Sequence, residues 1–248
     1  GEQHYVIGTP AGEDLMRIRA YAPEENHVVL RLRGEIAADG TLHGELKVEG
    51  DGQADTRLRR TLGQGRRDGV EPGLRRWLAQ LAPGAELTRW KSGDPQDWSR
   101  PLELELEFRV PGFARVGDRT CAWRPAALTL ALAGHGGVVR LAHPPHLAEE
   151  RETPAMLWWA QQLTIDETIE APRGFTPRLA ADAWQAGDAD AFAACDLDAS
   201  VDGREVRYAG TFRYDRRQVP VEAWPAFRAA VNTLREAGDA RLVAWKED

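Results

Sequence analysis

Alternation of apolar and polar residues is the strongest pattern along the chain, and it predicts a protein built mainly from β-strands. The clearest case runs from Leu102 to Val110, where Leu, Phe or Val at every second position alternates with Glu and Arg. A period of two places the apolar side chains on one face of a sheet and the charges in water. We therefore predict a half-buried strand over 102–110 that ends at Pro111-Gly112.

A β-hairpin is predicted upstream of this strand. Apolar and polar residues alternate over 28–32 and again over 42–48, and Asp39-Gly40 lies between the two runs. Gly tolerates the positive φ that tight hairpin turns require, so Asp-Gly between alternating runs indicates a hairpin. Apolar spacing of three and four residues adds short helices over 54–62 and, after Pro72, over 74–81, and one more strand is expected near 85–91.

The alternation lapses around Gly112–Arg119, and we place a domain boundary there. Beyond it, an apolar stripe at helical spacing predicts a helix over 221–237, and Asp202-Gly203 predicts a second hairpin turn. The Ala- and Asp-rich residues 182–198 receive no assignment. Further strands are predicted over 128–132, 163–169, 206–214 and 242–245.

These elements predict an α+β, β-rich fold of antiparallel sheets with a few packing helices. We divide it into a linker over 1–27, a β-β-α-β domain over 28–115 and a second β-rich domain over 119–248. Each domain is expected to be a small β-sandwich or a sheet covered by helices.

Composition narrows the class of protein. The 248 residues are 42% hydrophobic and 29% charged, which is typical of a globular protein with one large or two ordinary domains. A net charge of −7 argues against nucleic acid as a partner, because phosphates favour a basic face. No apolar run approaches the roughly 20 residues of a membrane-spanning helix. Lys and Ser occur only three times each, against 29 Arg, which we attribute to a GC-rich genome.

Two cysteines, Cys121 and Cys195, are candidates for redox or catalytic chemistry. They could pair in a disulfide or remain two buried free thiols, and sequence alone leaves both alternatives open. A cysteine hydrolase centred on Cys121 would need a histidine base, for which His135, His143 and His146 are available. The strand predicted after Cys121 disfavours that hypothesis, because such nucleophiles usually begin a buried helix.

The other candidate motifs are better interpreted as structural features than as metal-binding or phosphate-binding sites. The spacing His143-Pro-Pro-His146 is interrupted by prolines, and alternating acidic residues over 196–202 lack the Gly and Glu of a calcium loop. Seven arginines between Arg57 and Arg76 indicate a solvated helical face. Nucleotide, zinc and serine-hydrolase signatures are missing from the sequence, so we expect no metal, no cofactor and no catalytic residue.

Nine tryptophans suggest a binding face as an alternative. Trp77, Trp224 and Trp245 fall on apolar faces and are predicted to be core. Trp98, Trp158 and Trp159 fall near predicted loops, where aromatic rings can stack on sugars or peptides. A peptide- or glycan-binding β-domain that uses these loop tryptophans is therefore an open hypothesis, with packing inside the protein as the alternative.

Three segments resemble the region that follows the catalytic core of bacterial transglutaminase-like proteins. The resembling stretches are residues 7–15 with Pro23-Glu24-Glu25-Asn26; Asp39-Gly40 with Gly50 and Arg57–Arg59; and Val219–Arg228 with Leu242–Trp245, joined by Ile169–Phe175. These proteins are multi-domain chains with an N-terminal domain of unknown function, a transglutaminase-like core and a C-terminal β-rich region. The similar motifs are turns and a packing helix, so they bring no catalytic residue to this sequence.

The resemblance implies a function and a context. It implies a non-catalytic accessory module that packs against a transglutaminase-like core encoded upstream, in a larger parent protein that is periplasmic or otherwise extracytoplasmic. The partners expected on this basis are the upstream domains, with a peptide or glycan as a further ligand. Neither nucleic acid nor a membrane span is expected.

Overall fold

A computed structural model provides the coordinates. It describes residues 4–5, 16–17, 21–63, 70–133, 149–188 and 190–246.

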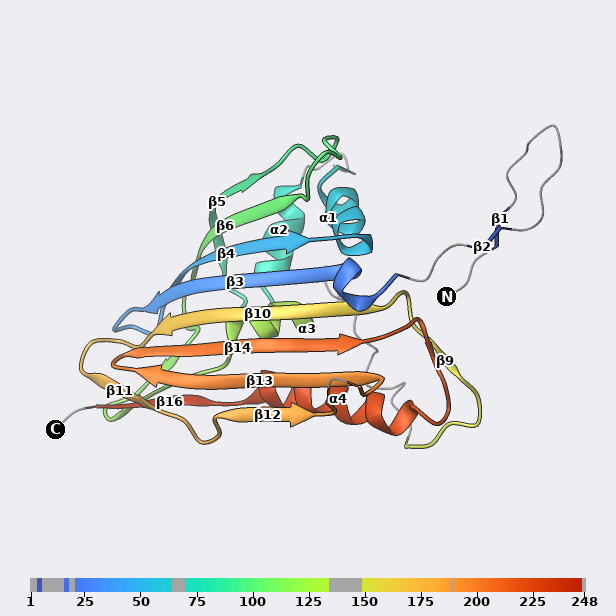
Figure 1. The fold of residues 1–248 in the computed structure, drawn as a ribbon. Helices are drawn as coiled ribbons and strands as arrows, with labels where there is room; N and C mark the ends of the chain where they lie inside the picture. The colour runs from blue at the N-terminus through green and yellow to red at the C-terminus, as the bar shows by residue number, and fades with distance from the viewer. Residues whose placement is uncertain are drawn as a thin grey trace.

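One eight-stranded sheet organises these residues (Figure 1). Its strand order is β12-β13-β14-β10-β3-β4-β6-β5. The strands are β3 (His27–Ile36), β4 (Leu42–Gly50), β5 (Glu86–Ser92), β6 (Glu103–Val110), β10 (Gln161–Glu170), β12 (Ala183–Ala186), β13 (Ala193–Asp202) and β14 (Glu205–Tyr214). The predicted β-rich α+β class is confirmed.

The centre of this sheet is a parallel pair. β3 and β10 lie side by side with Val28 opposite Leu163 and Leu32 opposite Glu167, whereas the other strand pairs of the sheet are antiparallel. The predicted segments 28–115 and 119–248 therefore contribute to the same sheet, and their buried side chains form one hydrophobic core. The expected boundary near Gly112–Arg119 does not separate two sheets, because periodicity identifies strands but not which strands pair.

The two faces of the large sheet differ completely. Figure 1 shows α1–α4 gathered on one side of the sheet, which is the side of the buried Leu, Val, Ile and Phe side chains. The helices are α1 (Gln53–Gly63), α2 (Glu71–Leu78), α3 (Ala126–Leu132) and α4 (Trp224–Asp239). The opposite face carries the alternating charged residues, and no described helix covers it.

A four-stranded sheet shares the hydrophobic core of the large one. Its order is β11-β16-β8-β7, and all of its pairs are antiparallel. The strands are β7 (Arg115–Val116), β8 (Thr120–Trp123), β11 (Phe175–Arg178) and β16 (Leu242–Lys246). Smaller elements are η1 (Pro23–Asn26) and two short pairs, β1 (His4–Tyr5) with β2 (Met16–Arg17) and β9 (Ala155–Met156) with β15 (Gln218–Val219).

Most predicted elements are confirmed within a few residues, and one is wrong. The run Leu128–Leu132, predicted as a strand, belongs to helix α3. Leu128, Leu130 and Ala131 are fully buried and Leu132 is partly buried, so the apolar spacing could not distinguish the two structures. Ala and Leu favour a helix, and Pro125 lies immediately before its first residue. The unassigned residues 182–198 form β12 and most of β13.

A buried carboxyl group joins α3 to the central strands. Glu167 on β10 is 1% exposed, and its Oε2 accepts a hydrogen bond of 2.5 Å from the backbone N–H of Ala127. Burial raises the pKa of Glu167 to about 7, although hydrogen bonds from Ala127 and Ala126 act in the opposite direction. The group therefore ionises in the folded protein only above its ordinary range.

The substitution Glu167→Gln tests the raised pKa of Glu167 through the pH dependence of the unfolding free energy. Because the folded pKa of about 7 lies above the ordinary 4.5, the group's favourable contribution is complete below pH 4.5 and is lost as pH rises to 7. The loss is about 3 kcal/mol by linkage. Gln keeps the acceptor oxygen and does not titrate, so the stability of the variant relative to wild type should rise by a similar amount between pH 5 and pH 8. Urea unfolding at several pH values measures the unfolding free energy of both proteins. If the difference between variant and wild type did not change with pH, the raised pKa of Glu167 would be contradicted.

Candidate functional site

An exposed apolar surface lies at one end of the large sheet. We call it the aromatic end and define it by Tyr21, Met156, Trp158 and Trp159. Trp158 is 63% exposed, Met156 59% and Tyr21 46%. Trp158 meets the partly buried Trp159 edge-on, with ring centroids 6.4 Å apart. The structure thus brings two of the three predicted binding tryptophans into contact.

The parallel centre of the sheet explains why these residues gather. Tyr21 lies shortly before β3, and Met156 and Trp158 lie shortly before β10. Because β3 and β10 are adjacent and parallel, with His27 opposite Gln162, the segments that enter them lie at the same end of the sheet. In Figure 1 this end is on the right, where β9 is labelled.

The aromatic end is held by backbone pairing rather than by a free loop. Met156 pairs with Gln218 of β15, and the backbone N–H of Leu157 donates to the carbonyl of Arg217 at 2.7 Å. The Nε of Arg217 donates to the carbonyl of Leu157 at 3.1 Å. The exposed rings are therefore presented on a positioned segment, which lowers the entropy lost on binding.

Two buried donors beside this surface lack acceptors. Nε1 of Trp159 and Nε2 of Gln161 have no hydrogen-bond partner among the described residues. Gln161 is 2% exposed, and its Oε1 accepts a long hydrogen bond of 3.4 Å from the hydroxyl of Tyr214. Because both nitrogens are buried, they belong to the packing beneath the surface and are out of reach of a docked partner.

Trp98, the third predicted binding tryptophan, belongs to a different cluster at the same end of the sheet. It lies in the loop before β6 and is 63% exposed. β6 is separated from β10 by β4 and β3, which amounts to about 14 Å at the usual strand spacing. Its ring packs over the guanidinium of Arg59, 4.6 Å from the centroid. The structure therefore does not place Trp98 with Trp158 and Trp159.

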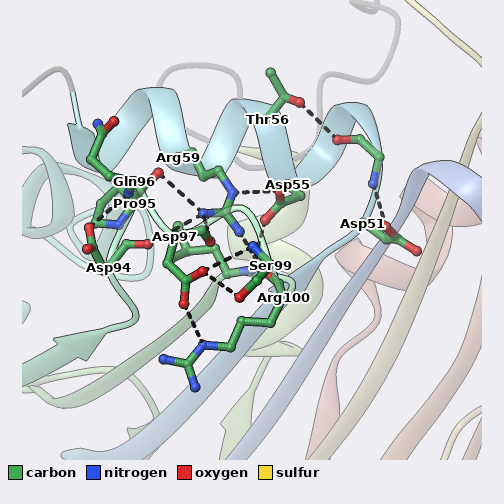
Figure 2. Close-up of polar contacts among 12 residues, drawn as sticks. Asp51, Asp55, Thr56, Arg59, Asp94, Pro95, Gln96, Asp97, Ser99 and Arg100 are labelled. Carbon is green, nitrogen blue, oxygen red and sulfur yellow. Dashed lines mark hydrogen bonds and ion pairs between the residues drawn. The ribbon is translucent and has the colours of Figure 1, made fainter.

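Arg59 clamps the loop that carries Trp98 (Figure 2). Although it belongs to the Arg-rich stretch predicted to face solvent, Arg59 is only 3% exposed. Its Nε donates to Asp55 Oδ2 at 2.6 Å, and its two terminal nitrogens donate to four carbonyls of the loop. These are the carbonyls of Asp94, Pro95, Asp97 and Arg100, at 3.4, 3.2, 2.7 and 2.5 Å.

The other oxygen of Asp55 completes the clamp. Asp55 Oδ1 accepts a hydrogen bond of 2.8 Å from the backbone N–H of Leu102, just before β6 begins. The hydrogen bonds of the guanidinium thus all go to groups of this protein. We therefore infer that the Arg59–Asp55 pair stabilises the loop and does not bind a ligand.

The open face of the large sheet contains a polar hollow of about 460 Å³. Its lining includes Arg31, Arg33, Lys47, Arg89 and Lys91, opposed by Glu45, Glu105 and Glu107. Most of these cations already form ion pairs: Lys47 Nζ lies 3.2 Å from Glu49 and 3.0 Å from Glu103, and Arg89 lies 3.1 Å from Glu107. The hollow is therefore a ladder of paired charges on a solvated face.

Neither cysteine is suited to catalysis. Cys121 on β8 and Cys195 on β13 are free and buried, so the disulfide considered from the sequence is not formed in this structure. Burial raises the pKa of Cys121 to about 11 and that of Cys195 to about 12. A thiol with such a pKa remains protonated at neutral pH and is a poor nucleophile. Cys121 lies within a strand, and His135, His143 and His146 lie outside the described residues.

The remaining predicted motifs are structural where they are described. Asp196, Asp198 and Asp202 point to the open face of β13, as expected for a solvated strand. Within the described residues no group of three or more His, Cys, Asp or Glu could hold a metal ion. No helix in that part of the chain is long and apolar enough to span a membrane. Of the stretches that carry the family resemblance, residues 7–15 lie outside the described part.

Sequence reasoning missed three notable residues. Glu167 was hidden in an alternating strand, where an acidic residue at an apolar position was the available signal. Arg59 looked like one surface arginine among seven. Trp245 was predicted to be core, yet it is 46% exposed, because it points to the outer face of the four-stranded sheet.

Comparison with known proteins gives no relative. No protein-family model matches the chain, and no curated protein matches it.

Replacing the buried arginine tests the loop clamp. Arg59→Lys keeps the charge but cannot serve Asp55 and four carbonyls at once, so we expect a loss of about 3–5 kcal/mol in unfolding free energy. Amide exchange in residues 94–101 should also accelerate. The matched control is Arg75→Lys, in the exposed pair with Glu71, where about 0.5 kcal/mol or less is expected. Equal effects of the two substitutions would contradict the clamp.

Thiol labelling tests the burial of the two cysteines. With pKa values near 11 and 12, neither thiol should react with iodoacetamide at pH 7.5 in the folded protein. Both should react in 8 M urea without added reductant. Mass spectrometry counts the adducts. Rapid labelling of native Cys121 would restore the nucleophile hypothesis, and failure of both to react in urea would indicate a disulfide.

Proposed function

We propose that this chain is a non-catalytic accessory module that packs against a partner protein domain through its aromatic end. The observation that carries the proposal is the exposure of Met156 and Trp158 on a backbone-paired segment, at the end of the sheet where the exposed Tyr21 also lies. Scattered exposed apolar residues are ordinary, but a group that includes a Trp, a Met and a Tyr at one end of a sheet is typical of an interaction site.

The residue types at the aromatic end support a protein partner. Trp, Tyr and Met are enriched in protein–protein interfaces relative to the rest of a protein surface. Trp158 and Met156 are the most exposed of the four residues that define this end.

The chemistry of the titratable groups supports a non-catalytic role. The two thiols are buried with raised pKa values, and Glu167, the carboxyl with a pKa near 7, is buried beneath α3 and occupied by a backbone donor. These three groups with raised pKa values are therefore buried in the protein core, where a substrate cannot reach them.

The identity of the partner comes from the family resemblance. On that basis the partner is a transglutaminase-like core in the same parent protein, and the parent is periplasmic or otherwise extracytoplasmic. The fold is compatible with this context, because a β-rich module with an open polar face can be attached to a core through one end.

A second candidate is a peptide- or glycan-binding domain that uses the loop tryptophans. The specific observation in its favour is the edge contact of Trp158 and Trp159, which leaves the Trp158 ring accessible for stacking. It is the weaker candidate, because Trp98 lies in a separate cluster and is already packed on Arg59.

The test begins with the reading frame upstream of the codon for Gly1, which should encode a core with a Cys-His-Asp triad. That core, produced separately, should bind this chain in a calorimetric titration. The double variant Met156→Ser/Trp158→Ser removes most of the exposed apolar area and should weaken binding at least about tenfold. Because both side chains are exposed, the unfolding free energy should change by only about 0.5 kcal/mol each.

The matched control is Trp98→Ser, an equally exposed tryptophan outside the aromatic end. It should leave the affinity unchanged. An upstream frame without a transglutaminase-like core would overturn the proposed parent. Binding that survives the double variant would overturn the proposed surface.

A further inference from the structure

The outer face of the four-stranded sheet forms a small platform around Trp245. We define the Trp245 platform by the outward-facing residues Arg115, Thr120, Thr176, Arg178, Val243 and Trp245. They lie on four different strands, and Trp245 is 46% exposed near their centre. An indole held open on a regular strand is a rigid stacking surface.

Strand register fixes the layout of the platform. Trp245 lies between Thr176 of β11 and Thr120 of β8, in one row across the sheet. The neighbouring row runs from Arg178 through Val243 and Ala122 to Arg115. The two arginines thus end a row four strands wide, with their Cα atoms about 14 Å apart at the usual strand spacing.

The charge of the platform is the opposite of that of the whole protein. The four strands read Arg-Val, Thr-Cys-Ala-Trp, Phe-Thr-Pro-Arg and Leu-Val-Ala-Trp-Lys, without an acidic residue. The chain as a whole carries 39 acidic residues and a net charge of −7. Within the described residues, neither Arg115 nor Arg178 forms an ion pair, unlike most cations on the large sheet.

We propose that the Trp245 platform binds an acidic oligosaccharide, with a pyranose ring stacked on Trp245 and carboxylates paired with Arg115 and Arg178. A sugar ring presents an apolar C–H face to an indole and hydroxyls to flanking threonines. Guanidinium groups pair with carboxylates through two parallel hydrogen bonds. Two arginines at the ends of one row select an extended ligand with more than one negative charge.

Position separates this site from the aromatic end. β16 ends near the C-terminus at the left of Figure 1, whereas the aromatic end lies at the right. The inference therefore does not depend on the proposed accessory role, and a chain docked through its aromatic end leaves the platform accessible.

The experiment is a calorimetric titration of the whole chain with tetragalacturonate, which carries four carboxylates. Saturable binding that weakens with added salt is expected. Trp245→Ala and the double variant Arg115→Gln/Arg178→Gln should each lower the affinity at least about tenfold, which corresponds to about 1.4 kcal/mol. The matched controls Trp158→Ala and Arg33→Gln remove an exposed ring and an exposed guanidinium elsewhere, and they should leave the affinity unchanged. Circular dichroism and the unfolding midpoint establish that each variant is folded.

Two further ligands separate the contribution of the sugar rings from that of the negative charges. The methyl-esterified tetramer keeps the sugar rings and removes the charges, and it should bind at least about tenfold more weakly. Tripolyphosphate keeps negative charge and removes the rings, and its affinity should be insensitive to Trp245→Ala. Failure of tetragalacturonate to bind at 10 mM, or an affinity that Trp245→Ala leaves unchanged, would overturn the proposal. Equal binding of the esterified tetramer would overturn the role of the arginines.

Discussion

The parallel pairing of β3 with β10, and the carboxyl group of Glu167 beneath it, are the constraint on which the structure depends. This pair joins two sets of antiparallel strands into one sheet. Glu167 lies opposite Leu32 on one side and Tyr208 on the other, and it accepts the N–H of Ala127 where α3 begins. A buried acid at this point fixes α3 over the junction, because an amide without an acceptor there would cost about 1–3 kcal/mol.

The same pairing determines where interaction surfaces can form. Helices cover one face of the large sheet, and the other face is a lattice of cross-strand ion pairs, so the exposed aromatic residues are found at the two ends. At one end, the parallel entry of β3 and β10 places the segments that carry Tyr21 and Trp158 at the same edge of the fold. At the other end, the four-stranded sheet presents Trp245. The two surfaces differ in chemistry as well as in place. The first presents exposed apolar side chains, and the second presents two guanidinium groups that form no ion pair among the described residues.

Local pattern predicted most elements of this fold but not their assembly. The strands over 102–110 and 206–214 follow from a period of two, and α4 follows from its apolar stripe. The union of both halves in one sheet did not follow, because strand pairing between β3 and β10 depends on contacts more than a hundred residues apart. Leu128–Leu132 was misread because no residue of this short, mostly buried run is fully exposed to reveal its period. Trp158 and Trp159 could be singled out because they fall near a predicted loop, whereas the burial of Arg59 depends on a loop about 40 residues away.

The error at Trp245 shows how far a residue's neighbours in sequence can mislead. Leu242, Val243 and Ala244 make the segment look like a core strand, and Leu242 and Ala244 are indeed buried. Trp245 points the other way, and whether that direction meets protein or solvent depends on what covers the second face of the sheet. No described element covers it, so the indole is exposed between two threonines in a sheet without acidic residues. An exposed indole on an acidic protein, in a four-stranded sheet whose strands carry no carboxylate, is better explained by a ligand with negative charge than by packing.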